Sequence, residues 1–167
     1  MEIQQNEISN KSRKQPLDRI DCEILATLQK NARLSNKELA VKVGLAPSSC
    51  LQRVRQLQKD RIIRSFHADI DPAALGIGLQ ALIAVRMKKH SRQLFKVLRA
   101  HLAVLSEVVS IAHISGPNDL LVQVVVRDTN HLRDLIVDQF ATRVEVDRCE
   151  TSIIYDYFRS PVLPKLI

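Results

Sequence analysis

The sequence SNKELAVKVGLAPSSCLQRVRQLQKDRII, residues 35–63, carries the strongest structural signals in the first part of the chain. Ser35 is followed three residues later by Glu38, and this spacing is typical of a capping box at the start of a helix. Gly44 can end that helix in the left-handed conformation, and Pro47 suits the first position of a second helix. The stretch therefore predicts two short helices joined by a tight turn.

The second of these helices carries two contrasting faces. Apolar residues at helical spacing predict the face that packs inward: Cys50, Leu51, Val54 and Leu57. The opposite side carries hydroxyl, amide and guanidinium groups without a carboxylate: Ser48, Ser49, Gln52, Arg53 and Gln56. Groups of these types bond base edges and phosphates when a helix lies in the major groove. An ordinary solvated face of a small helical domain is the alternative, and this stretch alone leaves both open.

The distribution of charge favours the first interpretation. The 167 residues carry a formal net charge of +7. Residues 1–67 hold 13 Lys and Arg against 7 Asp and Glu, whereas residues 68–167 hold 12 against 11. The basic excess thus lies in the half that contains the two-helix motif, which indicates a polyanionic partner for that half.

The motif lies within a helical region that we place at residues 16–64. Residues 1–15 are polar and lack periodicity, which predicts a disordered basic tail. Apolar residues then recur at helical spacing between Asp18 and Asn31 and predict a supporting helix, with Asp18 as its N-cap. Residues 65–78 alternate in polarity and then reach Asp71-Pro72 and two glycines, which predicts a linker strand and a turn.

Residues 79–160 change to a mixture of strands and helices. Strands are expected at residues 79–88, 107–115, 120–127 and 144–158, with helices at 91–103 and 128–140. The order β-α-β-β-α-β is typical of a ferredoxin-like sandwich, so the whole chain is expected to be α+β. Two helices cover one face of such a sheet. The other face also alternates apolar residues, and a second subunit is its natural cover.

The composition argues against several classes of protein. Cys22, Cys50 and Cys149 lie far apart, which disfavours a disulfide scaffold and a metal site, and we expect no cofactor. The N-terminus lacks the apolar region of a secretory signal and no apolar run is long enough to span a membrane, so we expect a cytoplasmic protein. The five histidines are scattered and no phosphate-binding glycine loop is present, which argues against an enzyme.

Several motifs, taken in order, resemble the Lrp/AsnC (feast/famine) family of transcription regulators. In the first half they are Leu17-Asp18-x-x-Asp21-x-x-Ile24-Leu25, the helix at residues 35–44, Ser48-Ser49-Cys50-x-x-Arg53-Val54-x-x-Leu57 and Asp71-Pro72-x-x-Leu75-Gly76. In the second half they are Ser115-Gly116-x-x-Asp119-Leu120-Leu121 and Glu150-Thr151-x-Ile153-Ile154. Each motif is weak alone, but their joint order and spacing over residues 16–158 are specific.

The resemblance implies a function that the residues alone do not. Members of the family join a helix-turn-helix domain to a ferredoxin-like sensing domain, and subunits pair through their sheets into dimers. The dimers assemble further, often into octamers made of four dimers. An amino acid or related metabolite binds between sensing domains and alters assembly and binding to double-stranded DNA. We therefore expect a sequence-specific DNA-binding regulator with such an effector, no enzymatic activity and no membrane partner.

The resemblance also assigns candidate site residues. For DNA they are Ser35, Lys37, Ser48, Ser49, Gln52, Arg53 and Gln56, from the two-helix motif. For the effector they are Gly116, Asn118, Asp119 and Leu120 in the expected ligand loop, and Thr151 and Ser152 in the facing strand. Asp119 suits an α-ammonium group, and a glycine lets backbone N–H groups approach a carboxylate. From residue types alone, a plain hairpin turn is the better interpretation of this loop, and the resemblance to the family reverses that preference.

The chain departs from the family pattern at a few positions. Ala46 stands where a hydroxyl cap is common, and Arg61 stands where a glycine usually ends the second helix. Cys149 replaces a frequent threonine, and Arg143-Val144-Glu145-Val146 replaces a frequent Pro-Gly before the last strand. The last two changes border the expected effector site.

Two alternative functions remain to be weighed against a DNA-binding regulator. A ferredoxin-like sensor or assembly protein that does not bind DNA would not explain the basic excess of the first half. RNA binding by the second half would need stacking aromatic residues on the central strands, and the expected strands at 107–115 and 120–127 contain none.

Overall fold

A computed structural model describes residues 16–89, 91–164 and 166. The contacts divide the chain into two compact units. Unit 1 ends at Ala68 and also takes in the segment that begins at Arg159, and unit 2 is Asp69–Phe158. The predicted tail at residues 1–15 lies outside the described residues.

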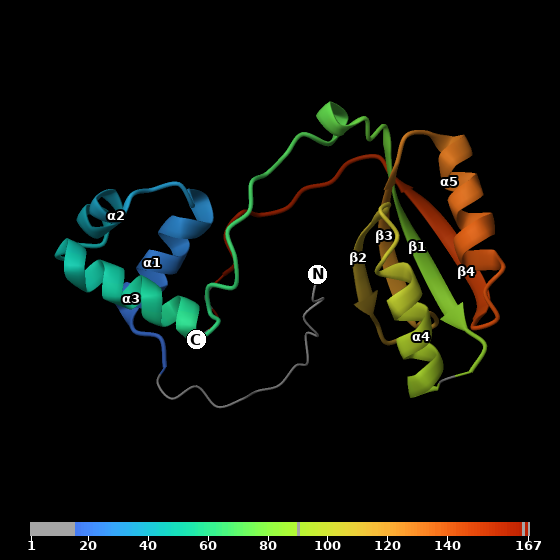
Figure 1. Ribbon diagram of the computed structural model, residues 1–167, viewed down its shortest axis with the longest axis horizontal. Coiled ribbons are helices and arrows are strands. Elements are labelled where there is room, and N and C mark those ends of the chain that lie inside the picture. Colours follow the sequence, from blue (N-terminus) through green and yellow to red (C-terminus); the bar gives the residue numbers. More distant parts are fainter. Residues whose placement is uncertain (1–15, 90, 165, 167) are drawn as a thin grey trace. The chain divides into compact units, whose positions relative to one another are not determined.

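Unit 1 contains three helices, α1 (Arg19–Lys30), α2 (Asn36–Lys42) and α3 (Pro47–Lys59), shown in Figure 1. Two capping boxes start the first two helices, as the sequence predicts. The Asp18 side chain accepts from the Asp21 N–H at 2.7 Å, and the Ser35 N–H donates to the Glu38 carboxylate at 2.8 Å. The three helices bury one aliphatic core: Ile24, Leu28, Leu39, Ala40, Val43, Cys50 and Leu57.

The ends of α2 and α3 have the same hydrogen-bond pattern, although their residues differ. After α2, the Leu45 N–H donates to the Ala40 carbonyl at 2.9 Å, with Gly44 at φ +67°. After α3, the Ile62 N–H donates to the Leu57 carbonyl at 2.9 Å, with Arg61 at φ +56°. Both ends are Schellman motifs. Arg61 therefore adopts the geometry that glycine provides elsewhere, at a backbone cost of about 1 kcal/mol.

The start of α3 lacks a side-chain cap, because Ala46 has no polar atom to offer. Another contact holds this end in place. The Asn36 side-chain amide, at the start of α2, donates to the Pro47 carbonyl at 2.8 Å. This bond ties the start of α3 to α2, but it supplies no acceptor for the first N–H groups of α3, so the helix start remains without a side-chain cap.

The linker does not form the strand that its alternating sequence predicts. Residues 64–71 are neither helix nor strand, because no neighbouring strand of the described chain pairs with them. The predicted turn is present as a short 3₁₀ helix, η1 (Pro72–Leu75), whose first turn is capped by the Asp71 side chain.

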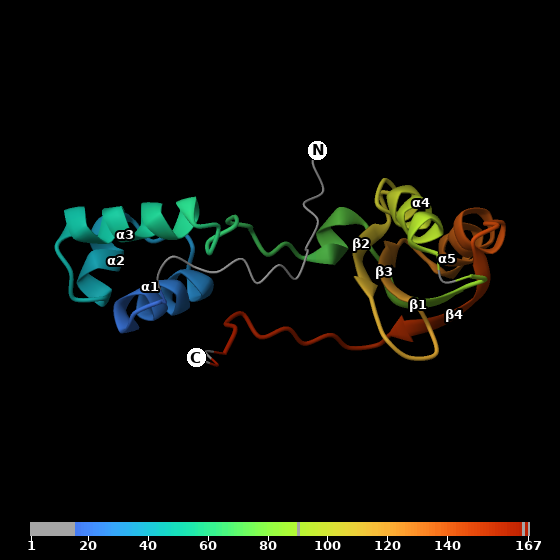
Figure 2. The same cartoon turned by 90° about the horizontal axis from the view of Figure 1, so that it is seen from below.

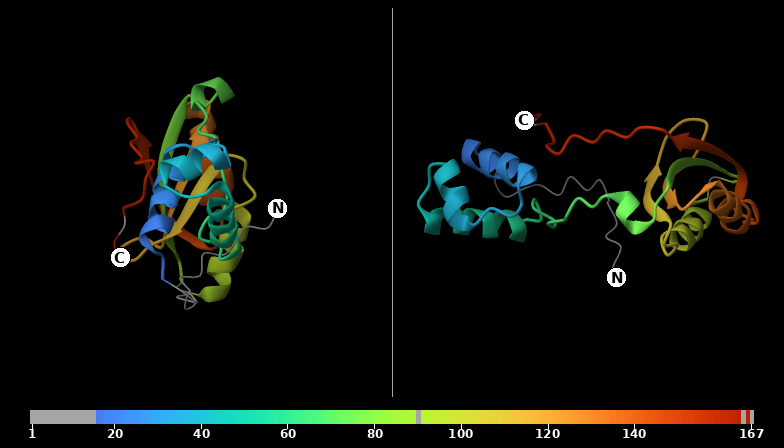
Figure 3. Two further views of the ribbon diagram at one scale, coloured as in Figure 1. Left: turned by 90° about the vertical axis from the view of Figure 1, so that its left-hand side faces the viewer. Right: turned by 90° about the horizontal axis from the view of Figure 1, so that it is seen from above.

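Unit 2 contains the predicted order of strands and helices. The elements are β1 (Leu79–Met87), α4 (Arg92–Leu102), β2 (Val108–His113), β3 (Leu120–Val126), α5 (Thr129–Ile136) and β4 (Val146–Ile154). A π-helical turn, Val137–Ala141, continues α5. The strands are antiparallel to their neighbours in the order β2-β3-β1-β4. Both helices lie on one side of the sheet (Figure 2, and the right panel of Figure 3). This arrangement is the ferredoxin-like sandwich.

Strand β4 is shorter than the predicted span of residues 144–158. Its last pair joins Ile154 to Gln80, one residue after the start of β1. Beyond this pair the neighbouring strand supplies no further backbone groups, so the ladder ends although the β-prone sequence continues.

Alternation of side chains gives the sheet a covered and an open face. The helix-covered face is fully apolar and forms the core with α4 and α5: Ala81, Ile83, Val85, Met87, Leu98, Leu102, Leu120, Val122, Val124, Val126, Leu132, Leu135, Phe140 and Val146. The open face mixes half-buried apolar residues with glutamines: Gln80, Leu82, Ala84, Leu121, Gln123 and Val125. Neither α4 nor α5, the helices of unit 2, lies over this face (Figure 2).

The segment that replaces Pro-Gly before β4 is held by an ion pair. Glu145 is 4% exposed, and both its carboxylate oxygens accept from the Arg143 guanidinium, at 2.8 and 3.1 Å. Burial disfavours the charged carboxylate, but the bond to its own backbone N–H and the Arg143 bonds outweigh it and lower the Glu145 pKa. The Lys88 N–H also donates to the Glu145 carbonyl at 3.0 Å. The turn into β4 is thus stabilised by the Arg143–Glu145 ion pair and contains no glycine.

Candidate functional site

The start of α3 presents short polar side chains to solvent. Ser48, Ser49 and Gln52 are exposed, and Ser35 and Lys37 are exposed at the start of α2. Of the α3 residues predicted to face inward, only Leu51 is exposed, so that prediction is wrong. Leu51 lies about 100° around the helix from Cys50, at the edge of the buried stripe. The described surface of α3 carries no carboxylate before its C-cap, as the sequence predicts.

Arg53 has a different environment from the one its polar neighbours suggested. Its Nη1 donates to an Asp18 oxygen at 2.6 Å and to an Asp21 oxygen at 2.8 Å, both at the start of α1. The Asp18 pKa is lowered by the Asp21 backbone N–H and then by Arg53, and the Arg53 pKa is raised by Asp21 and then Asp18. The structure therefore turns Arg53 toward α1 instead of toward the exposed stripe.

Gln56 and Arg55 complete the exposed part of α3. The Gln56 side-chain amide donates to both oxygens of the Asp60 carboxylate, at 3.0 and 2.9 Å. Arg55 is exposed and has no ion pair among the residues that the structure describes. Our interpretation of the sequence omitted Arg55. A helical wheel could have found it, since Arg55 lies seven residues after Ser48 and shares its face.

The expected effector loop joins β2 to β3. Gly116 has φ +119°, a conformation that side chains rarely allow. The Asp119 carboxylate accepts from the Met87 N–H at 2.8 Å, and the Asp119 N–H donates to the Val85 carbonyl at 2.9 Å. Asn118 has a buried side-chain oxygen with no hydrogen-bond partner in the described chain. The loop is thus fastened to the end of β1 by Asp119.

Leu120, the last residue assigned to the loop, is fully buried. It pairs with Val85 in the sheet and its side chain belongs to the core of unit 2. The structure therefore gives Leu120 a packing role, because strand alternation directs it under the helices.

Thr151 and Ser152 lie on opposite faces of β4. Thr151 pairs with Ile83 of the covered face, whereas Ser152 pairs with Leu82 of the open face. Both are exposed. The loop that carries Asp119 leads into β3, which lies on the opposite side of β1 from β4 in the order β2-β3-β1-β4. A single chain therefore does not bring the two halves of the expected effector site together.

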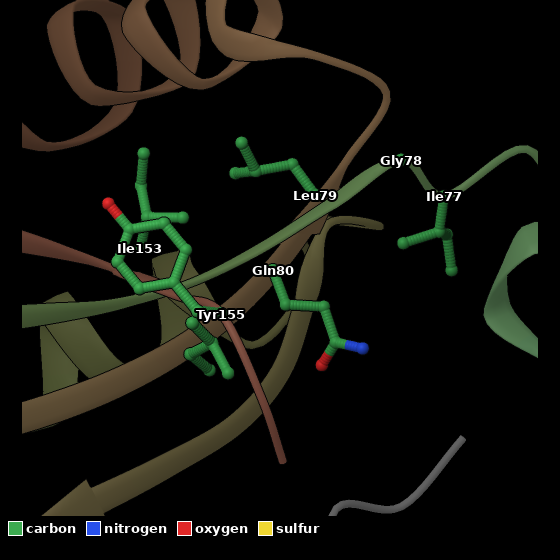
Figure 4. A pocket seen from close by; sticks show the side chains of 7 residues that line it. Ile77, Gly78, Leu79, Gln80, Ile153 and Tyr155 are labelled. Atoms are coloured by element: carbon green, nitrogen blue, oxygen red, sulfur yellow. The ribbon is translucent and has the colours of Figure 1, made fainter.

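Two hollows of unit 2 lie elsewhere. The first, about 450 Å³, lies between the start of β1 and the end of β4, and Figure 4 shows the side chains that line it, among them Ile77, Gln80 and Tyr155. Gly78 lines it, and a Cβ there would lie 2.3 Å from the Arg127 carbonyl oxygen. None of the predicted effector residues lines this hollow.

The second hollow, about 390 Å³, lies beside the turn before β2 and includes Glu107 and His131. The His131 Nε2 lies 3.2 Å from a Glu107 oxygen, and the Arg127 N–H donates to the His131 Nδ1 at 3.4 Å. Bonds to its own backbone N–H, then Ser106 and His131, lower the Glu107 pKa against the effect of burial. These contacts satisfy both ring nitrogens and tie α5 to the sheet.

Within residues 16–89 and 91–164, no group of three or more His, Cys, Asp or Glu side chains could hold a metal ion. No helix in the same ranges is long and apolar enough to cross a membrane.

Comparisons with known proteins cover both units. A family model described as winged helix-turn-helix DNA-binding matches residues 17–64, and one described as Lrp/AsnC ligand binding domain matches residues 80–161. The transcriptional regulator AldR of Mycolicibacterium smegmatis is 40% identical over 147 residues, 88% of this chain and 86% of that protein. The leucine-responsive regulatory protein of Escherichia coli K12 is 31% identical over 148 residues, 87% of this chain and 90% of that protein. The crystal structure of a transcriptional regulator from Neisseria meningitidis in complex with L-Met has a TM-score of 0.81 and 31% identity, over 87% of this chain and 94% of that one.

Proposed function

The chain belongs to the Lrp/AsnC family of transcriptional regulators, and from this premise we propose that it binds specific DNA sequences through α3 under the control of an amino acid or related metabolite. The observation that carries the DNA-binding part is the exposed, carboxylate-free surface of α3. Its first turns present Ser48, Ser49 and Gln52, whose hydroxyl and amide groups can read base edges in the major groove. Ser35 and Lys37, at the start of α2, are available to a phosphate.

The effector proposal rests on the loop between β2 and β3. The Met87 N–H orients the Asp119 carboxylate, which suits an α-ammonium group, and Gly116 leaves room beside the backbone for an α-carboxylate. The similar regulator from Neisseria meningitidis was crystallised with L-Met, which supports an amino acid as the class of effector. Methionine itself is one candidate among the twenty.

We also infer that the sensing units work as a homo-oligomer. The open sheet face combines Leu82, Ala84, Leu121 and Val125 with no covering helix, and a second copy of the chain is the cover that we propose. Since one chain keeps Thr151 apart from the Asp119 loop, a shared effector site requires a contact between copies. Four such dimers, forming an octamer, are the assembly that we expect.

Thermal melting of the full-length chain against the twenty amino acids at millimolar concentration tests the effector proposal. A ligand at about 100 times its Kd stabilises the folded state by roughly 2.7 kcal/mol, which gives a clear rise in Tm. Binding to DNA from upstream of its own gene, measured with and without the stabilising amino acid, then tests the link to regulation. An amino acid that raises the Tm without changing DNA binding would contradict that link.

Light scattering tests the assembly. Leu82→Glu places a charge on the open face, and we expect it to lower the molecular mass at micromolar concentration. Val104→Glu, at an exposed position after α4, is the matched control and should leave the mass unchanged. If Leu82→Glu retains the mass of the wild type, the open face is not the dimer contact.

A further inference from the structure

Helix α3 carries two arginines that point in different directions. Arg55 follows Arg53 by two residues, which turns its side chain about 200° around the helix axis. Arg53 is half-buried and faces α1, whereas Arg55 is exposed. The two guanidinium groups therefore cannot serve the same surface.

Arg53 pairs with Asp18 and Asp21, and we call these three residues the clasp; it links the middle of α3 to the start of α1. The Arg53 Nη1 lies 2.6 Å from an Asp18 oxygen and 2.8 Å from an Asp21 oxygen. The remaining oxygens of the same carboxylates form the capping box: Asp18 accepts from the Asp21 N–H at 2.7 Å, and Asp21 accepts from the Asp18 N–H at 3.4 Å. Any rotation of α3 about its axis would break bonds to both carboxylates.

The positive charge of Arg53 is also fully compensated within the clasp. Two carboxylates face one guanidinium, so Arg53 offers no surplus positive charge to a phosphate. The Asp21 side chain is 19% exposed, against 35% for Arg53 and 50% for Asp18, so the bond to Asp21 is the better shielded of the two from solvent ions. Arg53 is thus suited to fixing α3 rather than to contacting a polyanion.

A different set of residues forms the outward stripe of α3. Ser48, Gln52, Arg55 and Lys59 lie at i, i+4, i+7 and i+11, and all four are exposed. Neither Arg55 nor Lys59 has an ion pair among the described residues. The stripe thus begins with hydroxyl and amide groups and ends with two available cations.

We infer that this stripe is the surface that faces DNA, with Arg55 on the phosphate backbone, and that Arg53 is a positioning residue acting through Asp18 and Asp21. This inference rests on the proposed DNA-binding function. The first residues of a recognition helix reach base edges, while cations farther along it reach the phosphates beside the groove. The clasp sets the rotation of α3 and so decides which side chains meet the bases.

The test compares the two arginines on two duplexes. One duplex is selected from a random library by the wild-type chain, and the other is a random-sequence duplex of equal length. We expect Arg55→Ala to weaken both by the same factor and to reduce the magnitude of the slope of log K against log salt by about 0.9, the loss of one phosphate contact. Lys96→Ala, on α4 of unit 2, controls for the loss of one positive charge.

Arg53→Ala should give a different signature. We expect the salt slope to stay unchanged while the affinity for the selected duplex falls more than that for the random duplex, so that discrimination between them decreases. Arg53→Lys should recover part of the discrimination, since a lysine keeps the positive charge and a donor nitrogen, and Arg53 uses a single nitrogen for both bonds. A slope reduced by Arg53→Ala as much as by Arg55→Ala, or a slope unaffected by Arg55→Ala, would overturn the assignment.

Asp21→Asn keeps the test decisive if Arg53→Ala unfolds unit 1. It weakens the clasp from the α1 side and removes a negative charge, which by electrostatics alone would tighten binding to any DNA. We expect discrimination to fall; equal tightening on both duplexes would refute the positioning role. A wild-type chain that selects no duplex and binds none at low salt would overturn the proposed function itself, an outcome separate from any result on the arginines.

Discussion

Replacing Asp119 by alanine and by asparagine separates its two expected roles. The carboxylate accepts from the Met87 N–H at 2.8 Å, and Met87 is 5% exposed, so Asp119→Ala leaves an N–H without its acceptor in a largely buried environment. A hydrogen bond to a charged group contributes about 1.5–3 kcal/mol, and we expect unit 2 to lose about 2 kcal/mol. Asparagine retains an oxygen that can accept the same bond, and we expect a loss of under about 1 kcal/mol.

Hydrogen exchange of the full-length chain, followed on peptides covering β1, measures the effect in unit 2 separately from unit 1. A loss of about 2 kcal/mol speeds exchange at the end of β1 roughly 30-fold, since each 1.4 kcal/mol is a factor of ten. Neither variant has a negative charge for an α-ammonium group, so both should lose the rise in Tm caused by the effector. Equal exchange rates in all three proteins would refute the structural role, and a normal effector response of Asp119→Asn would refute the charge-based one.

Three further predictions concern the ion pairs, the end of α3 and acid. Glu145→Ala should lower the free energy of unfolding by about 2 kcal/mol, because it leaves the Arg143 guanidinium without its buried partner. Asp134→Ala should change it by less than about 0.5 kcal/mol, because the side chains of the Arg133–Asp134 pair are 67% and 60% exposed. Urea unfolding measures both effects. Arg61→Gly should raise the stability of unit 1 by about 1 kcal/mol, because it removes a side chain from the left-handed conformation, and an unchanged Tm would contradict this. The Asp18 pKa is lowered by folding, so its contribution should be constant above the ordinary value of 3.8 and be lost as the pH falls below it; exchange of the α1 amides at several pH values measures this.

Much of the local structure could be predicted because it depends on short-range patterns. Capping boxes join residues three apart, and Gly44 ends a helix through its own backbone freedom. Alternation of apolar and polar residues over residues 79–88 and of β-prone residues over 120–127 identified the two central strands, β1 and β3, which pair with each other. Even where Arg61 replaced the usual glycine, the same Schellman bonds formed, and Ile62 packs against the core cluster that contains Leu57, the hydrophobic contact that accompanies such motifs.

The candidate sites were harder to predict, because the sequence around a polar residue does not show which distant residue it will pair with. Arg53 looked like part of the exposed face, but its carboxylate partners lie 35 and 32 residues earlier in the chain. Thr151 and Ser152 are adjacent in sequence and were assigned to one site, yet strand geometry puts them on opposite faces. Leu120 was placed in the effector loop, but the register of β3 buries it in the core.

The family, the α+β class, the order of the elements and the basic character of the first half could all be inferred from the amino-acid sequence. These features follow from periodicity, capping and charge, which act between residues close in the chain. The three-dimensional structure was needed to show which arginine of α3 pairs with α1, which hydrogen bond holds Asp119, and that the two halves of the expected effector site lie apart in one chain. Those outcomes depend on contacts between distant segments, where packing and sheet register, rather than local preference, set the direction of each side chain.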